Sequence, residues 1–322
     1  MVACFSLQVE HALTRIVRSL AFVVALIVLA LQSGPSRADT FKPNFTLLYY
    51  AAQLANQAYD GRSELFGTLD GSTALVSVPG ETRVQYVLNF NHERRIQVVA
   101  VRGTVNATNK QLNRDTSLVV DQKTGIAMHR GFRSAAVTIY NDLRPKIRSG
   151  YTTYLLGHSL GGAVAAILGM YFTKDGIPVG RVVTFGQPKF TNVAGASAYS
   201  SLPLVRVIYQ NDVVSLLPIR SENGNQRFAH LGRALNLLSG PHYVLGDVAQ
   251  STRFSASSFE RMFGQASLPD HRMKWYLQGL RDKIRSAKRV KFSDRNRYIV
   301  RHKAGSGIDT APARKKYHFD QR

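Results

Sequence analysis

The chain has 322 residues, of which 44% are hydrophobic and 19% are charged, and its formal net charge is +22. This composition is ordinary for a globular protein, and the length suffices for one large α/β domain or two small ones. The single cysteine, Cys4, lies near the N-terminus. We therefore exclude disulfides, thiol chemistry and cysteine-based zinc sites from the rest of the chain.

The first 38 residues have the layout of a secretory signal peptide. Arg15 and Arg18 precede the apolar run Leu20–Leu31, and the small-x-small stretch 36–38 then offers a cleavage site. The apolar run is shorter than the roughly 20 residues that a transmembrane helix needs. We expect an extracytoplasmic protein, secreted or periplasmic, after cleavage near Ala38. The alternative is an uncleaved N-terminal membrane anchor.

Strand and helix patterns alternate along residues 39–280, which we interpret as one α/β domain. The expected elements, in chain order, are a helix over Phe45–Asp60, strands over Val84–Phe90 and Ile96–Gly103, a helix over His129–Ile147, a strand over 152–159 with a helix directly after it, a strand over Arg181–Gly186, a small-residue helix near 192–200 and a strand over Leu204–Asp212. This alternation predicts a mostly parallel central sheet with helices on both of its faces.

The stretch YLLGHSLGGAVAAILGMYF (154–172) contains a serine, Ser159, among three glycines. The apolar residues before Ser159 predict a buried strand, and the alanine-rich stretch after it predicts a helix. The pattern G-x-S-x-G between a strand and a helix is typical of a nucleophile elbow, which exposes a serine hydroxyl at the top of a sheet. The sequence therefore predicts Ser159 as a nucleophile.

A serine nucleophile needs an adjacent base, usually histidine, which is itself oriented by a carboxylate. In chains with a nucleophile elbow of this kind the order is serine, then the acid, then histidine. Asp212 directly follows an expected strand and is the favoured acid, although a strand-end aspartate also serves as a turn former or helix cap. Asp247 and Glu222 are weaker alternatives.

Three histidines follow Asp212 and compete for the role of base. They are His230, His242 and His271. Their order along the chain does not choose among them, because all three satisfy the expected sequence of acid before histidine.

Five blocks of the sequence, in this order, resemble the class 3 (fungal-type) lipase family. They are VVAVRGT, HRGF, LLGHSLGGAVA, VVTFGQPKFTN and VIYQNDVVSLLP. The resemblance spans roughly residues 45–280. It implies an α/β-hydrolase fold and a carboxylic ester hydrolase that acts on acylglycerols or other lipid esters through a Ser-His-Asp acyl-enzyme mechanism. It implies no metal and no organic cofactor.

The resemblance also assigns the members of the triad. It makes Ser159 the nucleophile, Asp212 the carboxylate and His271 the base, because the family's final histidine opens a late helix with aromatic residues just behind it. His230 resembles an earlier family histidine that is not a triad member, with Phe228 in place of the usual tyrosine. His230 remains the alternative base.

The developing oxyanion requires hydrogen-bond donors. One donor is expected from the backbone N–H of Leu160, directly after the nucleophile. The resemblance places the second donor at Thr104. The segment that follows, Val105–Gly125, corresponds to the family's lid but is largely polar. We therefore expect a weak lid and little interfacial activation.

Residues 281–322 hold fourteen Lys and Arg against four Asp, and we predict a basic, flexible C-terminal tail. The tail is either simply solvated or attaches the protein to an anionic surface such as lipid head groups. Nucleic acid is disfavoured as a partner, because the tail contains no recognised binding module and the chain carries an export signal. Two alternative functions stay open: a phospholipase at anionic membranes, and a non-catalytic protein that binds membranes or anionic polymers and has kept the fold.

Overall fold

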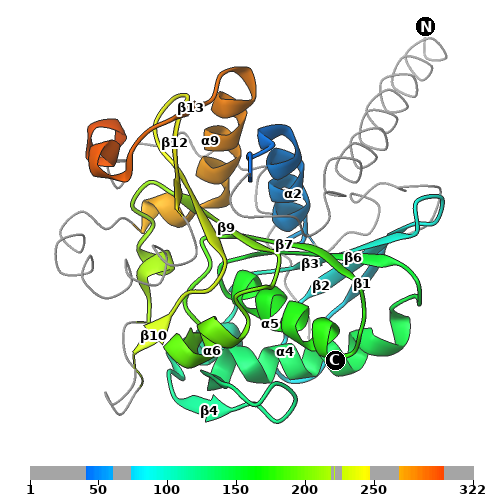
Figure 1. Cartoon of the computed structure of the whole chain (residues 1–322). Helices are drawn as coiled ribbons and strands as arrows, with labels where there is room; N and C mark the ends of the chain where they lie inside the picture. Colours follow the sequence, from blue (N-terminus) through cyan, green and yellow to red (C-terminus); the bar gives the residue numbers. More distant parts are fainter. Residues whose placement is uncertain (1–40, 61–73, 219–220, 222–226, 247–267, 301–322) are drawn as a thin grey trace, which may run out of the picture.

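The computed structural model describes residues 41–60, 74–218, 221, 227–246 and 268–300, which form a central sheet with helices on both faces (Figure 1). The expected signal peptide, its expected cleavage site and residues 301–322 of the expected tail lie outside the described residues. Within the described ranges, no helix combines the length and the apolar character that crossing a membrane requires.

The central sheet has the strand order β1-β2-β3-β6-β7-β9-β11-β12-β13 among the described residues. Its strands are β1 (Leu75–Ser77), β2 (Tyr86–Asn91), β3 (Ile96–Val101), β6 (Thr152–His158), β7 (Val179–Phe185), β9 (Leu204–Tyr209), β11 (Arg233–Leu237), β12 (His242–Gly246) and β13 (Lys288–Arg289). Neighbours run parallel from β3 through β6, β7 and β9 to β11, whereas the pairs β1–β2, β2–β3 and β11–β12 are antiparallel. The expected mostly parallel α/β sheet is confirmed.

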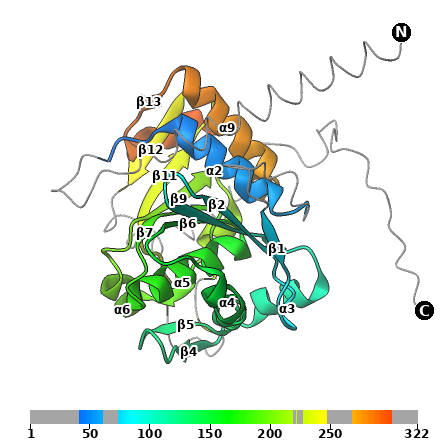
Figure 2. The same cartoon turned by 90° about the vertical axis from the view of Figure 1, so that its right-hand side faces the viewer.

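Helices cover the two faces of this sheet, as the two views show (Figures 1 and 2). The helices are α2 (Phe45–Gln57), α3 (Ala107–Arg114), α4 (Arg130–Leu143), α5 (Leu160–Lys174), α6 (Val193–Ala198) and α9 (Met273–Arg285). On one face α2 packs beside α9, and on the other face α4 packs beside α5. A small second sheet, β10-β8-β5-β4, consists of Phe228–Ala229, Thr191–Asn192, Ala127–His129 and Leu118–Val120.

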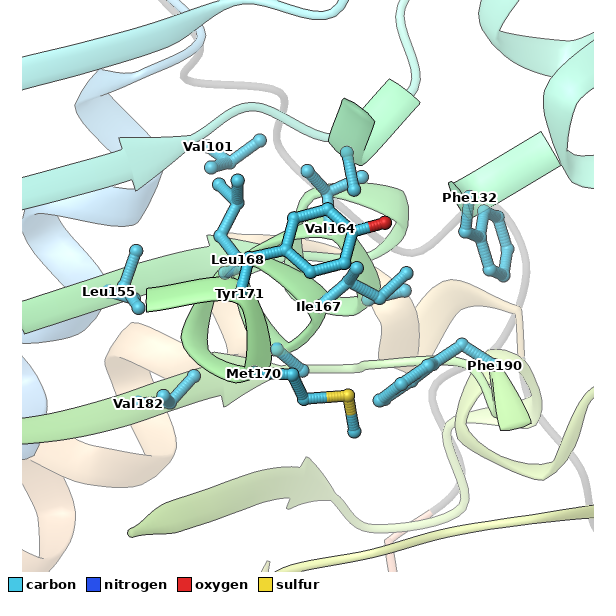
Figure 3. Packing of buried hydrophobic residues seen from close by; sticks show 14 of the residues in the cluster. Val101, Phe132, Leu155, Val164, Ile167, Leu168, Met170, Tyr171, Val182 and Phe190 are labelled. Carbon is cyan, nitrogen blue, oxygen red and sulfur yellow. The ribbon is translucent and has the colours of Figure 1, made fainter. Parts of the chain in front are cut away.

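Helix α5 is the most deeply buried of the described helices and fixes the strand-to-helix turn before it. All residues from Leu160 to Phe172 are buried, because small and aliphatic side chains surround the whole helix rather than one stripe. Its side chains, among them Leu168, lie against Val101, Leu155 and Val182 of three neighbouring strands (Figure 3). The N-terminus of α5 is thereby held at the carboxyl ends of β3, β6 and β7.

Residues 281–300 belong to the folded domain, which corrects the prediction of a flexible tail beginning at residue 281. Helix α9 continues to Arg285, β13 pairs with β12, and a 3-10 helix, η5, spans Phe292–Tyr298. Lys283 is only 1% exposed, and its Nζ donates to the carbonyls of Leu238 and Gly240, both at 2.8 Å. The high density of basic residues indicates a solvated segment, but a lysine can bury its aliphatic stem when its amine has hydrogen-bond acceptors. Charge density alone therefore does not predict this packing.

Candidate active site

Ser159 occupies the turn between β6, which ends at His158, and α5, which begins at Leu160. Its backbone φ of 58° and ψ of −130° lie outside the regions that non-glycine residues usually adopt, so the turn is strained. The turn is also crowded, because a Cβ on Gly157 would lie 2.2 Å from the carbonyl oxygen of Gly161. This geometry is that of the nucleophile elbow expected from the sequence.

The structure brings Ser159, His271 and Asp212 together in a continuous hydrogen-bonded chain. His271 Nε2 lies 2.8 Å from Ser159 Oγ, and His271 Nδ1 lies 2.8 Å from Asp212 Oδ2. Asp212 is buried at the carboxyl end of β9, and His271 closes a short 3-10 helix, η4 (Pro269–His271), just before α9. These are the atoms and distances that a base and its orienting acid require.

The carboxylate of Asp212 is fully engaged by its neighbours. Oδ1 accepts a hydrogen bond from Val214 N at 2.9 Å, and Oδ2 accepts a second one from the hydroxyl of Tyr276 at 2.5 Å. Gly186 lies against the same group with φ of 56°, and a Cβ there would sit 2.6 Å from Asp212 Oδ2. Any side chain at this position would therefore push the carboxylate away from His271.

A second histidine, His158, is hydrogen-bonded to the backbone of His271. His158 Nε2 donates to the carbonyl oxygen of His271 at 2.8 Å, and Nδ1 accepts from the hydroxyl of Tyr59 at 2.6 Å. Burial, reinforced by the nearby His271, lowers the pKa of His158 well below its usual value, so the ring stays neutral. Tyr59 also lies against Gly103, where a Cβ would sit 2.1 Å from the Tyr59 hydroxyl oxygen, and burial raises the pKa of Tyr59.

The two segments expected to supply the oxyanion donors lie next to Ser159. The N–H of Leu160 is in the first turn of α5, where N–H groups have no intrahelical acceptor and carry the positive end of the helix dipole. A Cβ on Gly103 would lie only 3.1 Å from Ser159 Cβ, so the strand end that carries Thr104 adjoins the nucleophile. The Thr104 hydroxyl accepts a hydrogen bond from Asn113 Nδ2 at 3.0 Å.

The competing candidates lie elsewhere or outside the described residues. His230 Nε2 donates to the carbonyl of Ser215 at 2.6 Å, and burial, with the charges of Arg206 and Lys189, lowers the pKa of His230 well below its usual value. His242 stacks on Tyr298 with 3.9 Å between ring centroids. Neither histidine is hydrogen-bonded to Ser159. The alternative acids at positions 222 and 247 fall in ranges that the structure does not describe.

The segment expected to form a lid contains the short helix α3, which is polar. Its N-cap Asn106 accepts from Asn109 N at 2.8 Å, and the buried Asn109 donates from Nδ2 to the carbonyl of Thr82 at 2.8 Å. The exposed apolar side chains of this segment are Val105 and Val120. Within the described ranges, no group of three or more His, Cys, Asp or Glu residues is arranged to hold a metal ion.

Sequence reasoning missed Gly186, Tyr59 and the supporting role of His158. Gly186 stands in the quoted block VVTFGQPKFTN, and His158 is the unspecified second residue of G-x-S-x-G. A glycine directly after a strand is a signal for a close approach, and this signal would have identified Gly186. Tyr59, at the end of the first helix, carries no signal in the sequence.

Comparison with known proteins gives one consistent family. The family described as lipase (class 3) matches residues 98–222. The secreted mono- and diacylglycerol lipase 1 of Fusarium solani is 31% identical over 142 residues, which are 41% of this chain and 42% of the relative. A lipase of Caenorhabditis elegans is 40% identical over 73 residues, 21% of each chain. The matches thus span less than half the length of these curated relatives.

Solved structures of fungal lipases share the fold. The triacylglyceride lipase of Rhizomucor miehei is 19% identical, with a TM-score of 0.54 and coverage of 73% of this chain and 95% of that chain. The Lip2 lipase of Yarrowia lipolytica is 17% identical, with a TM-score of 0.55 and coverage of 76% and 97%. At these identities the likeness establishes the α/β-hydrolase fold.

Proposed function

Because the chain belongs to the class 3 lipases of the α/β-hydrolase superfamily, we propose that it is a serine carboxylic ester hydrolase that acts on acylglycerols or other lipid esters. The observation that carries this proposal is the hydrogen-bonded chain from Ser159 Oγ through His271 to Asp212, with 2.8 Å at both links. A fold alone would not support an activity, whereas a nucleophile, base and orienting acid in contact support acyl transfer.

In the proposed reaction His271 Nε2 takes the proton of Ser159 as Oγ attacks the ester carbonyl. The N–H of Leu160 and Thr104 stabilise the negative charge that develops on the carbonyl oxygen. His271 then protonates the departing alcohol, and Asp212 holds the imidazole in the required tautomer and stabilises its cation. Water repeats the sequence on the acyl-enzyme and releases the carboxylic acid.

His158 serves this reaction as a positioning residue. Its Nε2–H fixes the carbonyl of His271, and Tyr59 in turn fixes Nδ1 of His158. Because Tyr59 also lies against Gly103, the residue before Thr104, it connects the base to the oxyanion side of the site. A neutral His158 also avoids placing a second cation beside the imidazolium that forms on His271.

Lipid esters are the favoured substrate class, and the protein is proposed to be extracytoplasmic after signal cleavage near Ala38. The relative from Fusarium solani is a secreted lipase of mono- and diacylglycerols. The polar character of α3 supports little interfacial activation. A rate on a short-chain ester that jumps many-fold at the solubility limit would contradict this last point.

The decisive test is turnover of p-nitrophenyl butyrate and of a diacylglycerol emulsion by the purified chain and by Ser159→Ala. We expect the variant to lose activity by about 10³- to 10⁶-fold, because the nucleophile is gone. Ser200→Ala is the matched control, since Ser200 is exposed at the end of α6. Equal rates for the native chain and Ser159→Ala would remove the enzymatic proposal and favour a non-catalytic lipid-binding protein. Turnover of phosphatidylcholine, measured in parallel, distinguishes acylglycerol hydrolysis from phospholipid hydrolysis.

A further inference from the structure

A cavity adjoins Asp212 but lies outside the hydrogen-bonded triad. It is walled by residues of β9, β11 and β12 and by the 3-10 helix η5, and its volume of about 80 Å³ is room for several water molecules. Much of its wall is apolar, including Ile208, Ala234, Val244 and Leu216. A cavity of this kind with a few convergent polar groups is the usual form of a small-molecule site.

Three basic side chains line the same cavity. Lys189 is 1% exposed and Arg206 is 2% exposed, and Arg295 of η5 is partly buried with its guanidinium over the ring of Phe292 at 3.9 Å. Arg206 Nε donates to the carbonyl of Leu231 at 3.0 Å. Arg206 Nη1 and Arg295 Nε are buried and have no hydrogen-bond partner among the described residues.

No carboxylate of the described chain neutralises these cations. Asp212 is the only acidic residue among the described residues that line the cavity, and its two oxygens are engaged by Val214, His271 and Tyr276. Burial lowers the pKa of Lys189 to about 8 and of Arg206 to about 9, and each still carries its charge at neutral pH. The described lining residues therefore supply no free carboxylate to neutralise the positive charge in the cavity.

The burial of Lys283 shows that this fold can satisfy a buried cation from its own backbone. Lys283 is as deeply buried as Lys189, but its amine donates to two carbonyls at 2.8 Å. Lys189 instead lines the cavity, and its charged neighbour is the cation Arg206 rather than a described carboxylate. The difference distinguishes a structural lysine from one that faces a cavity with its charge available to a ligand.

We propose that this cavity binds an amphiphilic carboxylate, whose head group contacts Lys189, Arg206 and Arg295 and whose alkyl chain lies along the apolar wall. A carboxylate matches the guanidinium fork and is a monoanion, and the apolar wall favours an alkyl chain over a hydrated inorganic ion. The carboxylic acids released by ester hydrolysis belong to this class, but the site does not depend on the proposed hydrolysis.

The test uses the full chain with Ser159→Ala, so that ester chemistry cannot contribute, and titrates decanoate by calorimetry below its micelle concentration. Decanol, which has the same chain without the charge, and inorganic phosphate, which has the charge without the chain, are the matched ligands. We expect decanoate to bind at least about tenfold more tightly than either, because charge-assisted hydrogen bonds to buried donors are strong. Equal binding of decanol, or tighter binding of phosphate, would overturn the proposal.

Substitutions then locate the bound carboxylate. Arg295→Gln and Lys189→Met, each made in the Ser159→Ala chain, are expected to weaken decanoate binding about tenfold, whereas Arg297→Gln, at an exposed position of the same 3-10 helix, leaves it unchanged. Arg295→Gln keeps the test valid if Lys189→Met misfolds, because Arg295 lies at the edge of the domain. Decanoate that binds in the catalytic cleft instead would be insensitive to both substitutions, and that result would refute the assignment.

Discussion

Asp212 adjoins two groups of buried polar side chains that the fold treats in opposite ways. The triad forms what we call the closed network. Both carboxylate oxygens of Asp212 accept hydrogen bonds, and His271 is hydrogen-bonded at Nδ1, at Nε2 and at its own carbonyl. In the neighbouring cavity, Arg206 and Lys189 are equally buried but lack an anionic partner among the described residues. A closed network holds a geometry by itself, whereas buried cations without partners lower stability and favour an anionic ligand.

The largest expected effect comes from replacing the carboxylate of Asp212, which accepts three of the hydrogen bonds in the closed network. Asp212→Asn should lower kcat on p-nitrophenyl butyrate by roughly 10⁴-fold, about 5.5 kcal/mol, because an amide holds the wrong imidazole tautomer. The measurement is steady-state kinetics with circular dichroism to verify folding. Asp175→Asn is the matched control, since Asp175 is also hydrogen-bonded to a tyrosine but lies at the end of α5. Activity of Asp212→Asn within tenfold of the native value would contradict the assigned role.

The second expected effect contrasts the two buried lysines. Lys283→Met should lower the free energy of unfolding by about 1–3 kcal/mol, because the buried carbonyl of Leu238 and the partly buried carbonyl of Gly240 lose their donor. Lys189→Met should be neutral or stabilising by about 1 kcal/mol without added anion, because it removes a buried charge that no described carboxylate pairs. Urea unfolding at pH 7 measures both values. Comparable destabilisation by the two substitutions would mean that Lys189 is satisfied as well as Lys283 is.

The third expected effect is a pH dependence of the free energy of unfolding, compared between the native chain and Lys189→Met. Burial lowers the pKa of Lys189 to about 8, so between pH 8 and the ordinary lysine value the unfolded chain binds more protons than the folded one. The native free energy of unfolding therefore gains up to about 2 kcal/mol from this group as pH rises from 8 to 10. Lys189→Met lacks this gain. Its stability difference from the native chain should shift in favour of the native chain over that window, and a constant difference would contradict the lowered pKa.

The sequence predicted the closed network better than the cavity. Ser159 and Asp212 could be found because the nucleophile elbow and the strand-end acid are local patterns. His271 needed the family resemblance, since three histidines satisfied the order. Lys189 could not be recognised, because a lysine in a sequence is expected to be exposed, and its burial results from strands that are distant along the chain.

The same reason explains the two other differences between prediction and structure. Charge density predicts a tail from residue 281, yet α9 continues to Arg285, and Lys283 within it is buried against carbonyl acceptors that the sequence does not reveal. Tyr59 reaches His158 across 99 residues of sequence, and no spacing rule covers such a contact. Local motifs indicate which residues react, and tertiary contacts decide which residues hold them in place.

The smallest expected effect tests whether the closed network depends on each of its donors. Tyr276 donates to Asp212 and Tyr140 donates to Asp175, each at 2.5 Å, so the two tyrosines form matched bonds to different carboxylates. Tyr276→Phe and Tyr140→Phe should each lower the free energy of unfolding by about 1–2 kcal/mol, because a charge-assisted hydrogen bond is lost. Only Tyr276→Phe should also lower kcat, by about 3- to 10-fold with KM unchanged, because the Asp212 carboxylate that orients His271 is held less firmly. Equal kcat values for the two variants would show that the contacts of Asp212 with Val214 and His271 suffice to hold it.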